Sequence, residues 1–324
     1  MVALQKYLKY SLILLILLFA ALTGMAVLTD ALPLIRGAYP GFFALSSAFF
    51  ILSIVFWVIP WAFLIRKHRT FSLRSALILG FSCVYGALTP VQVGAEALRA
   101  IKAKEVFKVP YSEAISAAMV VKGIKFFLLA LISSAVIVII FVEASVSPMM
   151  LFGLLSGFAV IVLASALFLL PLSGRMGRRI AGFFKGLAPF IPLFEVLEKY
   201  FAQYSSYLKT IPPKTFAVVF VMAALSFAFE FVALFFAFES LVLTIPLVPL
   251  AVLFVIISIL ERTPVLPRGI GLVEAAGFIF LSIPQFSQLS LTTAQIGAIL
   301  IVFDVVRLII PTILSLAVSF IKIK

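Results

Sequence analysis

The sequence predicts an all-α, polytopic membrane protein that forms a single integral membrane domain over residues 1–324. Two observations carry this prediction. Apolar residues make up 65% of the chain and charged residues only 11%, with a mean hydropathy of +1.30, a balance that soluble domains of this size do not have. Long apolar runs also recur between short polar segments, as expected for a series of membrane helices.

Six apolar runs are long enough to cross a bilayer, because a membrane helix needs about 20 apolar residues. They occupy residues 10–29, 42–65, 114–142, 148–171, 215–238 and 294–321. The first run continues without a small-residue cleavage motif, so we expect an uncleaved span rather than a signal peptide. Three further runs, 75–90, 245–260 and 270–283, are too short to cross without tilting or thinning the bilayer.

Lysine and arginine set the orientation of the spans. They form clusters before residue 10, around residues 66–74 and 99–108, through the central loop and at the chain end, whereas the presumed outer loops contain only Arg36. By the positive-inside rule these clusters are cytoplasmic, which predicts a plasma-membrane protein with both termini in the cytoplasm.

The same charge distribution predicts two re-entrant hairpins. Residues 75–98 have basic clusters at both ends, so they must enter the membrane and return to the cytoplasmic side. Residues 245–283 begin and end outside, which makes a second hairpin of opposite orientation. With about eight membrane segments in total, this pattern is inverted-repeat-like. The alternative is that residues 75–90 form a short, tilted span.

A cytoplasmic amphipathic connector, residues 172–213, divides the chain into a first half (1–171) and a second half (214–324). From Leu193 to Leu208 its apolar residues recur at the helical period, with charged residues on the other side. We expect it to link the two halves, and a lipid-sensing role is the alternative.

Two similar helix-breaking segments interrupt the apolar sequence and predict the binding site. They are T-P-V-Q-V-G-A-E-A-L-R at residues 89–99 and T-P-V-L-P-R-G-I-G-L-V-E-A-A at residues 263–276. Proline and glycine break a helix, and corresponding breaks in two halves of a membrane protein indicate a transporter site. A helix that restarts there presents unpaired N–H groups to an anion.

Ionisable side chains inside a membrane are costly, so each one suggests a function. Together with the helix breaks they give the predicted substrate-binding set: Pro90, Gly94, Glu96, Arg99, Lys122, Lys125, Arg268, Gly269, Gly271 and Glu274. The alternative is that such residues form internal salt bridges, as we expect for Asp304 and Arg307, which lie three residues apart on one helix face.

Several function classes are disfavoured. The chain has one cysteine and one histidine, no cluster with metal-ligand spacing, no nucleophile elbow and no Walker A sequence, so we expect no metal, no cofactor and no enzymatic activity. The net charge of +13 is distributed in short clusters rather than in a continuous stripe. Nucleic acid is therefore not an expected partner.

The two helix-breaking segments resemble sequence motifs of a known family. P-x-x-x-G-A-E-A-L-R, from Pro90 to Arg99, and L-P-R-G-I-G-L-V-E-A-A, from Leu266 to Ala276, are similar to signatures of the transmembrane domain of lysylphosphatidylglycerol synthases and the flippase-like family around it. Arg268 stands where that family usually has glycine, and Val273 where it often has arginine. The synthases carry a soluble aminoacyl-transferase domain after the membrane part, whereas this chain ends at Lys324, so lysyl transfer is not expected.

The resemblance implies the movement of an anionic phospholipid, or of a polyprenyl-linked lipid, between leaflets. The expected partner is then a membrane lipid with an anionic headgroup. Two alternatives stay open: a secondary transporter of a small anionic solute, and a non-transporting membrane subunit that assists a lipid-modifying enzyme or a glycosyltransferase.

Overall fold

The computed structural model describes residues 2–66, 71–88, 94–143, 148–189, 191, 193–262 and 267–321. In these ranges all regular secondary structure is helical. The first half contains α1 (Val2–Leu28), α2 (Leu32–Arg36), α3 (Pro40–Arg66), α4 (Leu73–Phe81), η1 (Val84–Leu88), α5 (Gly94–Phe107), α6 (Tyr111–Glu143), α7 (Pro148–Leu169) and η2 (Leu170–Leu172). The connector contains α8 (Gly174–Leu187) and α9 (Leu193–Lys209). The second half contains α10 (Pro213–Ser240), α11 (Leu247–Arg262), η3 (Pro267–Gly269), α12 (Leu272–Ser282), α13 (Pro284–Ser287), α14 (Thr293–Asp304), η4 (Val305–Ile309) and α15 (Ile310–Ser319).

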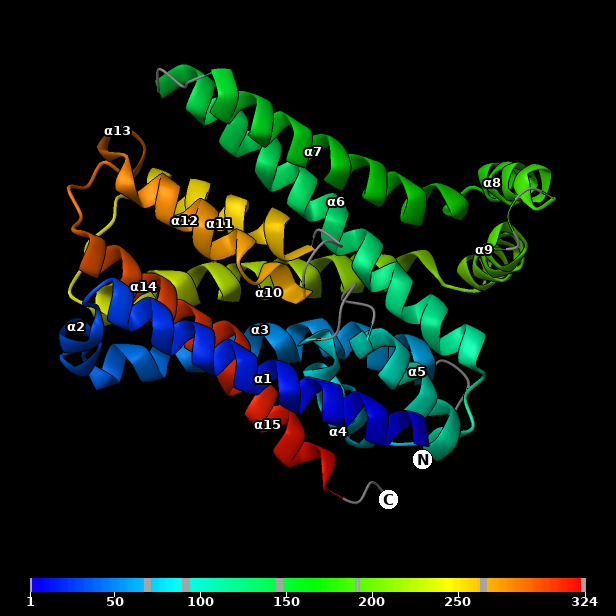
Figure 1. Cartoon of the computed structure of the whole chain (residues 1–324). Coiled ribbons are helices and arrows are strands. Elements are labelled where there is room, and N and C mark those ends of the chain that lie inside the picture. Colours follow the sequence, from blue (N-terminus) through cyan, green and yellow to red (C-terminus); the bar gives the residue numbers. More distant parts are fainter. Residues whose placement is uncertain are drawn as a thin grey trace.

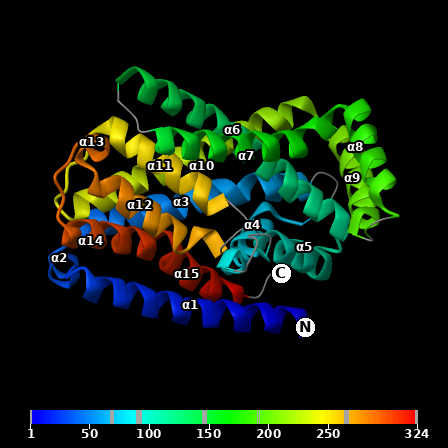
Figure 2. The same ribbon diagram turned by 45° about the horizontal axis from the view of Figure 1, so that its top comes forward.

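The long helices run back and forth along one common direction (Figure 1). Within the described residues, five segments are long and apolar enough to cross a membrane: Pro40–Arg66, Tyr111–Ile139, Leu155–Leu172, Pro213–Ser240 and Thr293–Ser319. Each overlaps a predicted span, which confirms a polytopic helical membrane protein. The sixth predicted span, 10–29, overlaps α1 and stays a prediction. Helix α1 lies on the opposite side of the bundle from α6 and α7 (Figure 2).

Helices α3 and α10 pack along a seam with a seven-residue repeat. On one side of the seam, Phe42, Phe49 and Phe56 of α3 alternate with Phe229 and Phe236 of α10, and neighbouring ring centroids lie 5.1–5.9 Å apart. Seven residues return to nearly the same face of a helix after two turns, so this repeat keeps two antiparallel helices in register along their length.

Small residues occupy the other side of the same seam. Ser46 Oγ donates to the carbonyl oxygen of Ala233 at 2.7 Å, and Ser226 Oγ donates to that of Ser53 at 2.9 Å. Ser46, Ser53 and Ser226 are buried, and both pairs again repeat after seven residues. Small side chains let membrane helices approach closely, and each interhelical hydrogen bond adds to the contact.

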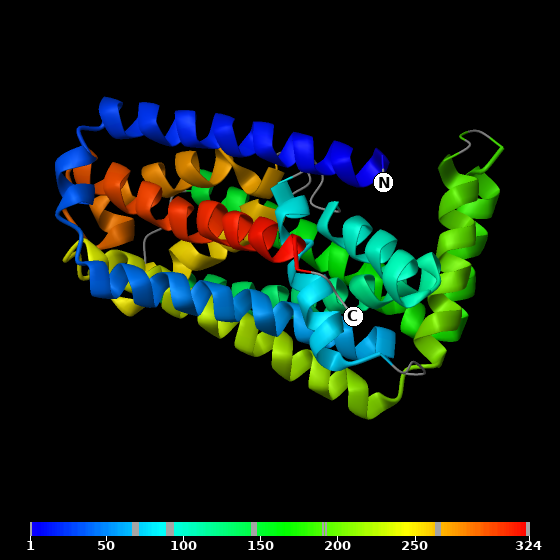
Figure 3. The same cartoon turned by 90° about the horizontal axis from the view of Figure 1, so that it is seen from below.

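Each half contains two short helices that fold back on each other between long helices. The first hairpin is α4, η1 and α5, and the second is α11, η3 and α12. In the bundle both ends of the first hairpin lie near α8 and α9, whereas both ends of the second lie at the opposite end (Figure 3). The turns η1 and η3 contact each other. This helix order is the one that an inverted repeat requires, and re-entry into the membrane stays a prediction.

Glycine permits the close approach within the first hairpin. A Cβ atom added at Gly86 of η1 would lie 2.5 Å from Leu98 Cδ1 and 3.0 Å from the backbone nitrogen of Ala95. Only a residue without a side chain lets η1 contact the start of α5 in this way. The hairpins are predicted to fold at residues 89–94 and 261–271, and of these residues 89–93 and 263–266 lie outside the described residues.

The connector forms two helices, α8 and α9, which pack against each other across one end of the bundle (Figure 3). The predicted amphipathic helix from Leu193 is α9. Its apolar face is buried at Phe201, Tyr204 and Leu208, and the Tyr204 hydroxyl donates to the carbonyl oxygen of Phe168 in α7 at 2.9 Å. The apolar face of α9 therefore contacts protein, which fits a link between the halves.

Replacing Ser46 by leucine is expected to destabilise the protein by about 1–3 kcal/mol, because the larger side chain must separate α3 from α10 and the hydrogen bond to Ala233 is lost. Thermal unfolding in detergent measures this. The matched control is Leu45→Ile at a neighbouring position that is 42% exposed, where little change is expected. Equal melting temperatures for the two variants would contradict the importance of the seam.

Candidate functional site

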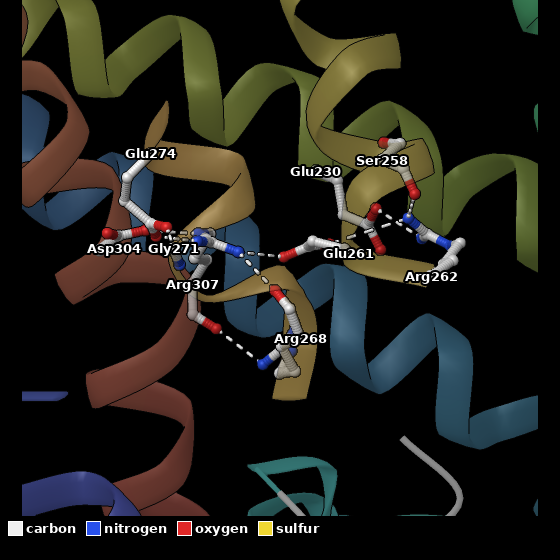
Figure 4. Close-up of polar contacts among 9 residues, drawn as sticks. All are labelled: Glu230, Ser258, Glu261, Arg262, Arg268, Gly271, Glu274, Asp304 and Arg307. Carbon is white, nitrogen blue, oxygen red and sulfur yellow. Dashed lines mark hydrogen bonds and ion pairs between the residues drawn. The ribbon is translucent and has the colours of Figure 1, made fainter. Parts of the chain in front are cut away.

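Charged side chains from the middle of the long helices meet inside the bundle (Figure 4). Lys125 lies near the middle of α6, Glu230 lies in α10, and Arg307 lies in η4 between α14 and α15. Arg307 is fully buried at 0% exposure. Burial of a charge among apolar helices is costly unless the charge is paired and hydrogen-bonded, so these residues must satisfy one another.

Arg307 binds three carboxylates from three different helices. Its Nε donates to Asp304 Oδ1 at 2.6 Å, its Nη1 to Glu261 Oε1 at 2.9 Å, and its Nη2 to Glu274 Oε1 at 2.6 Å. These short, charge-assisted bonds are of the strongest kind found in proteins. They fasten α11 and α12 of the second hairpin to the end of α14.

The backbone around Arg307 is adapted to this contact. Residues Val305–Ile309 form a π-helical turn, a feature often found at functional sites. Pro311 has no N–H to offer to the carbonyl oxygen of Arg307 four residues earlier, and this oxygen instead accepts from Arg268 Nη1 at 2.8 Å. In return, Arg307 Nη1 donates to the carbonyl oxygen of Arg268 at 3.2 Å.

The turn before α12 has an unusual backbone. Gly269 and Gly271 have φ angles of 67° and 88°, and a Cβ atom at Gly269 would lie 2.8 Å from the carbonyl oxygen of Leu260. Both positions therefore need glycine. Arg268 also has a positive φ of 48°, which is rare for a residue with a long side chain and costs about 1 kcal/mol.

Glu230 is held by two cations. Lys125 Nζ lies 3.0 Å from its Oε1, and Arg262 Nη2 lies 3.2 Å from its Oε2. Arg262 Nη1 also lies 3.7 Å from Glu261 Oε2, so Glu261 connects this group to Arg307. Ion pairs therefore join α6, α10, α11, α12 and α14 in one continuous network.

A second group of charges comes from α5 and from the first half of α6. Lys122 Nζ lies 3.7 Å from Glu96 Oε1. The Arg99 guanidinium stacks 4.0 Å above the Trp57 ring, and its Nε donates to the carbonyl oxygen of Gly80 at 3.1 Å. Glu96 Oε2 and Arg99 Nη2 are buried and have no hydrogen-bond partner among the described residues.

These two groups face one cavity, which together with the open space at its mouth has a volume of about 740 Å³. Four basic side chains and three carboxylates line it, together with an apolar wall. The charged lining residues are Glu96, Lys122, Lys125, Glu230, Glu261, Arg262 and Arg268. The apolar wall contains Phe50, Ile54, Trp57, Val84, Ala87 and Phe126.

The structure brings most of the predicted binding residues to this region. Glu96, Lys122, Lys125 and Arg268 line the cavity, and Arg99 lies behind Trp57. Gly94 begins α5, and Gly269 and Gly271 form the turn before α12, whereas Pro90 lies outside the described residues. Glu274 is bound to Arg307 and does not belong to the cavity lining described here, so its contact is the internal salt bridge that the alternative interpretation expected.

Three charged lining residues were not in the predicted set: Glu230, Glu261 and Arg262. Glu230 stands alone in its own span in the sequence, but α6 and α11 supply its partners. Glu96 and Arg99 stand three residues apart and so could pair on one helix face, but the ion pair that Glu96 forms is with Lys122. The spacing of three residues within one helix predicted the Asp304–Arg307 pair. The sequence contains no comparable signal for ion pairs between different helices.

Fold and network together define the class: a polytopic helical membrane protein with a charged cavity among its long helices. The family model of the lysylphosphatidylglycerol synthase TM region matches residues 7–315, and the chain belongs to this family. The resemblance at the two short motifs is thereby confirmed over most of the chain. No curated protein and no solved structure matches the chain.

Replacing Arg307 by methionine is expected to destabilise the protein by about 3–5 kcal/mol, because three buried carboxylates lose their common partner. The control is Lys199→Gln, which breaks the exposed Lys199–Glu195 pair on α9 and should leave the melting temperature unchanged. Thermal unfolding in detergent compares the two. If Arg307→Met melted like the wild type, Arg307 could not be the centre of the network.

Proposed function

We propose that this protein moves a lipid with an anionic phosphate headgroup, an anionic phospholipid or a polyprenyl-linked lipid, between the leaflets of the plasma membrane, without catalysing a reaction itself. The observation that carries the proposal is the cavity, whose described lining has more cations than carboxylates. An excess of positive charge inside an apolar bundle attracts an anion strongly, because little water is there to screen it.

Two of the lining cations are available to such an anion. Among the described residues Arg268 forms no ion pair, and its hydrogen bond to the carbonyl oxygen of Arg307 uses one of its five N–H groups. Within the described part of the chain, the ion pair of Lys122 is the long contact of 3.7 Å to Glu96. A phosphate between these side chains could accept several charge-assisted hydrogen bonds.

The lining also favours an amphiphilic substrate over a small soluble anion. Charged residues lie beside aromatic and aliphatic ones, so one cavity offers both a headgroup contact and an apolar contact. Membership in a family described by the membrane region of a phospholipid synthase supports the same choice. A small-anion transporter and an accessory subunit are the competing outcomes of the test below.

We place the two hairpins as re-entrant elements of opposite orientation, with both termini and the connector in the cytoplasm. The basic helix α8, which contains Arg175, Arg178 and Arg179, lies at the end of the bundle where α1 begins and α15 ends (Figure 3). The positive-inside rule assigns this end to the cytoplasm.

Liposomes that contain the purified protein are expected to exchange fluorescent anionic phospholipid between leaflets faster than zwitterionic phospholipid. Arg268→Gln and Lys122→Gln should each slow this exchange by about tenfold or more, because a lost charge-assisted hydrogen bond to phosphate is worth about 1.5–3 kcal/mol. Lys185→Gln on α8 is the control and should exchange like the wild type. Absence of exchange with every lipid and gradient would overturn the proposal in favour of a soluble anion or an accessory role.

Cysteine labelling tests the membrane placement. The single native cysteine, Cys83, is buried, so Cys83→Ala gives a clean background. Single cysteines are then placed at exposed positions flanking the hairpins, Arg74 and Glu105 for the first and Thr244 and Ser290 for the second. An impermeant maleimide should label the first two only from the cytoplasm and the last two only from outside. Labelling of Arg74→Cys and Glu105→Cys from opposite sides would mean that the first hairpin crosses the membrane.

A further inference from the structure

Arg307 contacts more negative charge than one guanidinium can neutralise. Its three carboxylate partners, Asp304, Glu261 and Glu274, all lie within 2.9 Å of its nitrogen atoms. Glu261 is shared with Arg262, but the ion pairs of Asp304 and Glu274 within the described residues are with Arg307 alone. This end of the network therefore carries excess negative charge.

Asp304 and Glu274 also occupy the same edge of the guanidinium. Nε and Nη2 are adjacent N–H donors, an edge that normally binds the two oxygens of a single carboxylate. Here Nε donates to Asp304 and Nη2 to Glu274, so two different carboxyl groups are forced side by side (Figure 4). Carboxylates held on one edge of a guanidinium disfavour each other's ionised forms, and a shared proton would relieve this repulsion.

An unpartnered oxygen gives independent support. Asp304 is 1% exposed, and its Oδ2 has no donor among the described residues. The second oxygen of Glu274 accepts from the backbone N–H of Gly271. A proton on Asp304 would turn the unpartnered oxygen into a donor.

Among the described residues, no other cation forms an ion pair with Asp304 or Glu274. Helices α1, α2, α3, α10, α12 and α15 pack against α14 or η4. Apart from Glu274, their described side chains bring only Glu230 to the network, and Glu230 is already paired with Lys125 and Arg262. Arg268 approaches from η3 and donates to a backbone carbonyl.

We propose that Asp304 and Glu274 bind one proton between them, and that an anion on Arg268 strengthens the binding of this proton. The first statement rests on geometry alone, and the second rests on the proposed function. Glu274, whose side chain is 13% exposed, is the entry point, since Asp304 is buried.

The charge balance of the network links the proton site at Asp304 and Glu274 to the anion site at Arg268. The network contains four carboxylates and four cations: Glu230, Glu261, Glu274, Asp304, Lys125, Arg262, Arg268 and Arg307. A phosphate that binds Arg268 neutralises one of the four cations and leaves surplus negative charge, which a bound proton cancels. Coupling of this kind is reciprocal, so protonation must also tighten the binding of the anion.

Infrared difference spectroscopy on the wild-type protein in lipid nanodiscs tests for the proton directly. We expect a protonated carboxylic acid band that persists at neutral pH, shifts in heavy water and disappears on further alkalinisation. Asp304→Asn and Glu274→Gln should each remove the band at neutral pH, because the carboxylate that remains on the Nε–Nη2 edge of Arg307 then has no second carboxylate on that edge with which to share a proton.

Two controls keep the assignment specific. Glu96→Gln removes the other buried carboxylate with an unpartnered oxygen, and Glu195→Gln removes an exposed one. Both should keep the band. Loss of the band in Glu96→Gln alone, or absence of any such band in the wild type, would overturn the proposal.

The linkage is tested with dihexanoyl phosphatidylglycerol as a soluble anionic probe. At a fixed pH, its addition should increase the band in the wild type but not in Arg268→Gln, and its affinity should rise by up to about tenfold per unit of decreasing pH where the proton is taken up. If the band does not change when the probe is added, the linkage is overturned. Lipid exchange without any titrating band overturns the proton site, whereas a titrating band without lipid exchange overturns the proposed function and leaves the proton site intact.

Discussion

The ion pairs around Arg307 are the interaction on which the rest of the interior depends. A guanidinium with no exposed surface is tolerated among apolar helices only because three carboxylates and a backbone carbonyl bind it. These partners come from α11, η3, α12 and α14. The second hairpin is therefore positioned by electrostatics as well as by packing, and a displacement of α11, α12 or α14 would separate a buried charge from its partner.

This arrangement requires irregular backbone at the same depth. The π-helical turn, Pro311 and the positive φ angles of Gly269 and Gly271 all lie beside Arg307 or Arg268. Each of them costs helical hydrogen bonds or conformational freedom, and the freed carbonyls are taken by arginine side chains. Broken helices at depth survive where protein or a polar cavity satisfies their backbone, and both are present here.

The network also explains which charges remain for a ligand. Glu230 and Glu261 are occupied by Lys125, Arg262 and Arg307, whereas Arg268 forms no ion pair among the described residues and Lys122 has only a long one. The cavity therefore combines a rigid, self-paired side with cations on the other side that are open to an anion. Preorganised cations beside an apolar wall suit a molecule that has both a phosphate and hydrocarbon chains.

The sequence by itself determined the class of fold, because composition and apolar run length follow directly from the thickness of a bilayer. It also located the two helix breaks and the Asp304–Arg307 pair, since proline, glycine and a spacing of three residues act locally. The tertiary structure decided the rest. The cavity lining also includes Glu230, Glu261 and Arg262. Glu96 pairs with Lys122 rather than with Arg99, and Glu274 pairs with Arg307. These choices depend on which helices lie side by side, and a buried charge takes the partner that packing brings to it rather than the one nearest in the chain.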